Sequence, residues 1–78
     1  MQIDAHAKVS IDELNERFGI MISKGAYQTL GGFILDHLGH IPKRGEKIET
    51  ESCIFIILSA YQKKVNWIRI LKKSHPDR

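Results

Sequence analysis

The chain has 78 residues, enough for one small domain, and with 42% hydrophobic and 27% charged residues its composition is that of a globular protein, which excludes a disordered chain. The longest apolar run, 53–58, is far shorter than the ~20 residues of a membrane-spanning helix, and the first residues have neither the basic start nor the apolar stretch of a signal peptide. Cys53 is the single cysteine, so no internal disulfide forms, and its place in the apolar run predicts a buried thiol.

The formal net charge of +3 is unevenly distributed along the chain. Residues 1–39 carry three basic against five acidic side chains, a net of −2, whereas residues 40–78 carry nine against four, a net of +5. A basic half suits nucleic acid, an anionic membrane surface or an acidic partner, and it also fits a set of solvated surface faces. Because no base-reading motif is present, we expect no specific nucleic-acid binding.

The first elements follow from alternation and capping. Residues 2–10 place Ile3, Ala5, Ala7 and Val9 on one side, which predicts a half-buried strand. The segment 10–13, Ser-Ile-Asp-Glu, is a capping box, so a short helix is expected over 11–18. Gly19 then suits the left-handed residue that ends a helix.

A loop over 21–25 precedes a second helix, which is expected to begin between 26 and 29 and to end at Leu38. Its apolar face comprises Leu30, Phe33, Ile34, Leu38 and, just beyond, Ile41. Gly31 and Gly32 lie in the first turn, where each glycine costs ~1 kcal/mol relative to alanine. Two such residues indicate close backbone packing, and Gly32 is expected to cross the sheet or the first helix.

After the helix, Gly39 and Pro42 prevent its continuation, and the pattern changes to strands over 47–50, 53–59 and 65–72. The strand 53–59 is apolar on both faces and is expected to lie centrally. The predicted fold is α+β, in the order β-α-α-β-β-β, with two helices packed on a mainly antiparallel sheet. Residues 1–73 form the predicted domain, and 74–78 are expected to be a disordered tail.

No arrangement of side chains indicates catalysis. Glu49 and Glu51 are two apart on a predicted strand and are expected to be solvated, and no serine lies in a nucleophile motif. His37 and His40 are three apart, but Gly39 interrupts the helix between them and no ligand set is completed, so no metal site is predicted. His40 is expected to cap the helix end or to lie in water.

The start of the second helix is the one candidate binding site. Helix N-termini attract anions, which makes Tyr27, Thr29, Gly31 and Gly32 candidates for contact with a phosphate or nucleotide. Packing is the favoured explanation for the two glycines, and the ligand interpretation stays open.

The segment 26–46 closely resembles the signature of the transporter-associated domain at the C-terminus of CorC/HlyC proteins. The shared features are Tyr27, the Thr-Leu-Gly-Gly helix start at 29–32, the apolar helix, and Leu-Gly-His-Ile-Pro-Lys-Arg-Gly over 38–45. Residues 11–15 and 18–20 resemble the family's first helix, and 65–71 its last strand, so the resemblance covers residues 3–72. The chain departs from the pattern at 61–64, where the family often has an Asp-Gly turn, and at 51–52, where a glycine is common.

The resemblance implies a fold like that of FAD-binding and transporter-associated domains, and a soluble, non-enzymatic, regulatory module on the cytoplasmic face of the membrane. Its parents are magnesium and cobalt efflux or hemolysin-like ion-transport proteins, in which a membrane domain and a pair of CBS domains precede the module. FAD stays open as a cofactor, and so does a homodimer. Two alternatives remain: a flavin or nucleotide binder, and a free-standing basic module that binds RNA or an acidic protein through Lys63, Lys64, Arg69, Lys72 and Lys73.

Overall fold

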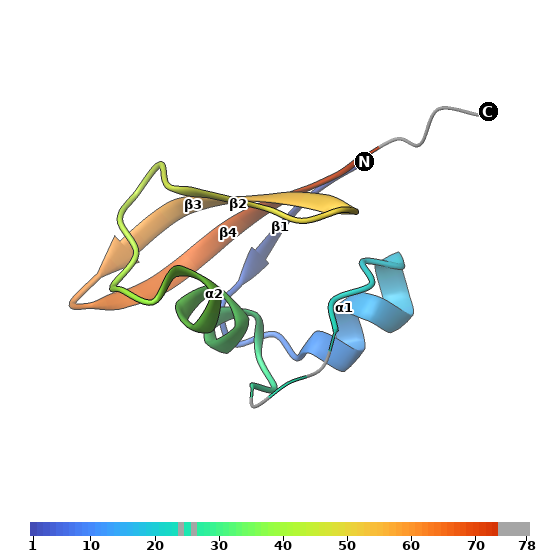
Figure 1. Cartoon of the computed structure of the whole chain (residues 1–78), viewed down its shortest axis with the longest axis horizontal. Helices are drawn as coiled ribbons and strands as arrows, with labels where there is room; N and C mark the ends of the chain where they lie inside the picture. Colours follow the sequence, from blue (N-terminus) through green and yellow to red (C-terminus); the bar gives the residue numbers. More distant parts are fainter. Residues whose placement is uncertain (24, 26, 74–78) are drawn as a thin grey trace.

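A computed structural model describes residues 1–23, 25 and 27–73. Two helices cover one face of a four-stranded sheet whose order is β1-β4-β3-β2, with every neighbouring pair antiparallel (Figure 1). The predicted α+β fold and element order are confirmed. The elements are β1 (Gln2–His6), α1 (Ile11–Phe18), α2 (Leu30–Leu38), β2 (Lys47–Glu49), β3 (Cys53–Tyr61) and β4 (Lys64–Lys72).

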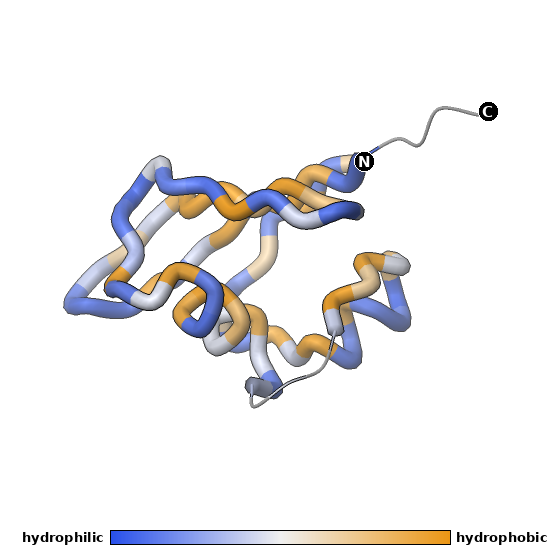
Figure 2. Tube along the Cα trace, in the orientation of Figure 1, coloured by the Kyte–Doolittle hydropathy of each residue, from blue (hydrophilic) through white to orange (hydrophobic). Residues whose placement is uncertain are grey.

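The core lies between the sheet and the helices. Alternate residues of β3 and β4 point into it, and Phe55, Ile57, Ile68 and Ile70 are each at most 1% exposed. Figure 2 shows hydrophobic segments on the sheet and on the helices that it faces. Cys53 is fully buried among them, as predicted. β3 and β4 are the two central strands, which confirms the prediction for the segment 53–59.

Capping sets the bounds of both helices: α1 matches the predicted 11–18, whereas α2 begins at Leu30, just after the predicted start between 26 and 29, because Thr29 is its N-cap. The Ser10 hydroxyl accepts a hydrogen bond from the backbone N–H of Glu13, and α1 ends at Gly19 with φ of 64°. Thr29 caps α2 in the same way, and Gly39 follows that helix with φ of 70°. These left-handed residues are favourable because glycine has no Cβ to clash.

β1 is shorter than the predicted strand over 2–10. The Lys8 N–H donates to His6 Nδ1 at 3.1 Å, and the Val9 N–H donates to the His6 carbonyl at 3.1 Å, so the chain turns after His6. Ala7 and Val9 still face the core, because their apolar side chains pack there from the turn. The alternation therefore predicted the buried side of the chain correctly and the end of the strand wrongly.

The second helix also differs from its predicted apolar face at one position. Leu30, Phe33 and Ile34 are buried and Leu38 packs against the core, but Ile41 is 49% exposed. The helix ends at Leu38, so Ile41 no longer follows the helical spacing on which the prediction rested.

In the described residues no helix is long and apolar enough to span a membrane. The predicted tail, 74–78, lies outside the described residues.

Candidate functional site

The backbone donors at the start of α2 are occupied by the protein itself. The Leu30 N–H donates to the Val9 carbonyl at 2.9 Å, and the Gly31 N–H donates to the Ala7 carbonyl at 2.9 Å. The Gly32 N–H donates to Thr29 Oγ1 at 3.2 Å. An anion bound at a helix N-terminus needs these same groups, so a phosphate here would have to displace three protein hydrogen bonds.

Gly31, and not Gly32, makes the close approach to another segment, which is the turn that follows β1. A Cβ at Gly31 would lie 2.9 Å from the Ala7 Cβ and 3.2 Å from the Ala7 carbonyl oxygen. A Cβ at Gly32 would lie 3.0 Å from the Tyr27 Cβ, within the loop that precedes the helix. The packing explanation therefore holds for the pair, but the prediction that Gly32 crosses the sheet or the first helix is wrong.

The four candidate residues do not converge on one cavity. Tyr27, Thr29 and Gly32 share a wide hollow of about 580 Å³ that also contains Asp36. Gly31 lies in a separate hollow of about 440 Å³, beside Thr29, His6 and Lys8. The negative carboxylate of Asp36 would repel a phosphate in the first hollow.

Tyr27 also lines a smaller cleft of about 280 Å³ together with Phe33, His37 and Glu51. Its ring packs edge-on against Phe33 at 5.5 Å between centroids, and its hydroxyl donates to the Ser23 carbonyl at 3.0 Å. Phe33 in turn contacts the His37 ring at 4.8 Å. The aromatic residues therefore support one another and join the loop to the helix.

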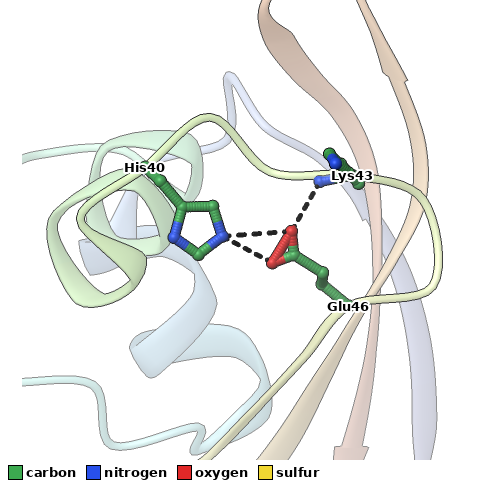
Figure 3. A network of polar contacts seen from close by, with 3 residues as sticks. All are labelled: His40, Lys43 and Glu46. Carbon is green, nitrogen blue, oxygen red and sulfur yellow. Dashed lines mark hydrogen bonds and ion pairs between the residues drawn. The ribbon is translucent and has the colours of Figure 1, made fainter.

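His40 does not cap the helix end; its side chain is exposed to solvent, as the other alternative predicted, and it also pairs with Glu46. Its Nε2 lies 2.7 Å from Glu46 Oε2, and the Lys43 N–H donates to Glu46 Oε1 at 2.9 Å (Figure 3). The hydrogen bond from His40, followed by that from the Lys43 backbone, lowers the pKa of the Glu46 carboxyl below its ordinary value. Glu46 thus joins the two ends of the loop that follows α2. The sequence does not indicate this role for Glu46.

His37 and His40 have different neighbours, Phe33 and Glu46 respectively. Among the described residues, no group of three or more histidine, cysteine or acidic side chains is arranged to hold a metal ion. His75 lies outside the described residues.

The basic residues proposed to bind RNA do not form one patch. Arg69 is held by both oxygens of Asp4, at 2.9 and 3.1 Å, and Lys73 pairs with Glu49 at 2.6 Å. Lys72 donates to the Phe18 carbonyl at 3.4 Å. Lys63 and Lys64 lie at the opposite end of β4 from Lys72, which is about 26 Å away at the usual rise of a strand.

The Asp4–Arg69 pair was not predicted from the sequence, because its members are 65 residues apart. Their hydrogen bonds lower the pKa of the Asp4 carboxyl and raise that of the Arg69 guanidinium. Only the register of β1 against β4 brings them together, since Asp4 lies directly opposite Arg69. A pair of this kind becomes visible once strand pairing is known.

Known proteins with a similar sequence or structure belong to a family of the same fold. Residues 2–74 match the family described as "Transporter associated domain" (CorC_HlyC). The magnesium and cobalt efflux protein CorC of Escherichia coli K12 is 31% identical over 64 residues, which are 82% of this chain and 22% of that protein. The chain therefore spans about a fifth of the length of this curated relative.

Two solved structures share the architecture closely. The transporter associated domain CorC_HlyC from Nitrosomonas europaea has a TM-score of 0.82 and 27% identity, covering 92% of this chain and 87% of that one. The corresponding domain of a Xylella fastidiosa hemolysin, solved in complex with Mg²⁺ and Mn²⁺, has a TM-score of 0.81 and 20% identity, covering 94% and 89%. With the family match extending over nearly its whole length, the chain belongs to the transporter-associated (CorC_HlyC) domain family.

Proposed function

We propose that this chain is a cytosolic accessory domain that regulates a membrane ion transporter of the CorC type. The observation that carries the proposal is the match over residues 2–74 to a transporter-associated family, together with a relative named for magnesium and cobalt efflux. The chain corresponds to 22% of that relative, so the transport itself is assigned to the remainder of the parent protein.

The rest of the parent, in this proposal, contains several membrane helices and a pair of CBS domains. The chain contributes a compact, non-enzymatic unit on the cytoplasmic side. The ordering of its loops by hydrogen bonds, such as Glu46 to His40 and to the Lys43 backbone, suits a domain that presents rigid surfaces to its neighbours. A role through surface contacts also agrees with the occupied donors at the start of α2.

Deletion of residues 2–73 from the parent tests this proposal in cells. We expect the shortened parent to reach the membrane at the same level, and the cobalt tolerance of the cells to change, because transport would lose its regulation. Membrane fractionation with an epitope tag controls for protein level. Unchanged tolerance to cobalt and to magnesium, at equal protein level, would refute a regulatory role.

The flavin alternative has a separate test. Titration of the 78-residue chain with FAD, followed by the fluorescence of the flavin, measures binding directly. We expect no saturable change at micromolar FAD, because a phosphate would compete with hydrogen bonds that α2 already makes. Saturable binding that is lost in the variant Gly32→Val would move the flavin function to first place.

A further inference from the structure

The face of the sheet that points away from the helices is apolar at its centre. Cys53, Phe55 and Ile57 of β3 point into the core, so the intervening residues point outward. Figure 1 shows both helices on the other side of the sheet, and no described element covers this outer face. The outward apolar residues, which neither join the core nor pack against it, are Ile54, Ile56, Leu58, Trp67 and Leu71. We call these five residues the outer stripe.

Most of the charged side chains around the outer stripe are paired within the chain: Asp4 with Arg69, and Glu49 with Lys73. Arg69, in the middle of β4, donates from Nε and one terminal nitrogen to the two carboxylate oxygens of Asp4 on β1. Lys47 and Glu49 lie on β2 at the opposite edge. Burying a charge is costly unless it is paired, so the Asp4–Arg69 pair removes the main obstacle to covering this face. The charged side chains of this face, Asp4, Glu49, Arg69, Lys47 and Lys73, sum to only +1, so the face has little of the positive charge that attracts a nucleic acid or an anionic membrane.

The outer face is also complementary to itself. Asp4 pairs with Arg69, Arg69 with Ile56, and Ile56 with Lys47, so one row crosses all four strands from an acidic edge to a basic edge. A two-fold axis parallel to the strands, over the line between β3 and β4, lays β1 of one copy on β2 of the other. It brings Asp4 opposite Lys47 of the second copy.

The same two-fold axis also brings together apolar residues of the neighbouring row. Leu71 and Ile54 are cross-strand partners, so the two-fold axis places Leu71 of one copy over Ile54 of the other. Two sheets packed face to face lie about 10 Å apart with strands crossing at about 30°, a spacing that branched aliphatic side chains fill and that a lysine bridges. We propose that the outer stripe is a homodimer interface, in which two copies of this chain pack sheet against sheet.

The size of the face predicts a weak dimer. Four strands about 4.8 Å apart and about six residues long give about 400 Å² of flat face per copy. The total accessible area buried would then be on the order of 1,000 Å², below the usual ~1,200–2,000 Å² of stable complexes. We therefore expect a reversible monomer–dimer equilibrium with a dissociation constant between about 1 µM and about 1 mM.

Sedimentation equilibrium of the 78-residue chain, from about 10 µM to about 1 mM, measures this dissociation constant. The variant Ile56→Thr keeps a β-branched side chain but places a hydroxyl in the stripe of both copies, and it should weaken the dimer about tenfold or more. Lys47→Glu places a carboxylate opposite Asp4 of the other copy and should also weaken it, with no change to the core. Circular dichroism and the melting temperature at low concentration check that both variants fold.

Matched controls exist outside the face. Ile41→Thr changes an isoleucine that is 49% exposed after α2, and Arg44→Glu makes an equal charge change in the same loop. Both should leave the dissociation constant unchanged. A chain that stays monomeric at about 1 mM overturns the proposal, as does a dimer that tolerates both Ile56→Thr and Lys47→Glu. Because this test uses the isolated chain, it can fail while the proposed regulatory role stands, and the reverse also holds.

Discussion

Gly31 and Gly32 are adjacent in sequence but meet different surroundings. Gly31 is buried and faces the turn at Ala7, whereas Gly32 faces its own preceding loop at Tyr27. The sequence predicted a packing reason for the pair, because two glycines in a good helix conflict with helix propensity. It could not say which glycine meets the turn after β1, since that depends on the rotation of α2 about its axis.

The two alanine variants should therefore differ. Gly31→Ala pushes a methyl group against the Ala7 carbonyl that accepts the Gly31 N–H, so we expect a cost of about 1–3 kcal/mol. Gly32→Ala meets a Tyr27 side chain at 3.0 Å but regains helix propensity, so its net effect should be within about 1 kcal/mol of zero. Thermal unfolding followed by circular dichroism decides between them. Equal melting temperatures for the two variants would contradict the packing described here.

Glu46 gives a prediction about pH. Because His40 and the Lys43 backbone lower the folded-state pKa of this carboxyl, the unfolded chain protonates first as the pH falls. The stabilising contribution is therefore complete above the ordinary pKa of 4.5 and is lost as the pH falls through the lower folded value. The melting temperature of Glu46→Gln should lie below that of the parent chain near pH 7, and this difference should shrink toward about pH 3.

A second variant controls for the partner. In a chain that already carries His40→Ala, the effect of Glu46→Gln near pH 7 should be smaller, since the main contact to the carboxylate is gone. A difference between the parent chain and Glu46→Gln that is the same at every pH would count against the charged pair. Neither the pair nor its partner Lys43 was predicted, because a loop gives no periodic pattern from which contacts can be inferred.

Among the elements, both helices and all four strands were predictable from capping and periodicity. Their ends were less so, and β3 and β4 extend beyond the predicted 53–59 and 65–72. The reason is the connection between them: Gln62 and Lys63 have φ of 52° and 64°, and Tyr61 pairs with Lys64 across a two-residue turn. Left-handed conformations at both turn residues are typical of Asn-Gly. Gln62 and Lys63 rarely adopt them, so these residues did not predict the ends of the two strands or the tight turn.

The same turn offers a stabilising substitution. Replacing Gln62 with Asn and Lys63 with Gly relieves two left-handed residues that carry bulky side chains. We expect about 1 kcal/mol of added stability, or a melting temperature about 4–8 °C higher. Reversing the order, with Gln62→Gly and Lys63→Asn, is a control of the same composition and should gain less. No gain from either order would show that the turn is not strained.

At the scale of the whole molecule, the fold and the family follow from the signature over 26–46, which the structure explains as local architecture. Thr29 caps α2, Gly31 meets Ala7, Gly39 ends the helix, and Glu46 closes the following loop. These residues hold the domain together, so they identify the family without identifying a ligand site. The outer stripe shows the opposite case. Ile54, Ile56 and Leu58 predict only that the segment 53–59 is a central strand, because the sequence does not reveal which sheet face the helices leave uncovered.

The role proposed for this domain is the regulation of ion transport by the protein that contains it. Its most direct test is the flux of Co²⁺ through the purified parent in proteoliposomes, compared with the same protein lacking residues 2–73. We predict that both forms transport the ion and that the flux differs between them over the physiological range of Mg²⁺. Equal flux from the two forms at every Mg²⁺ concentration would contradict the claim.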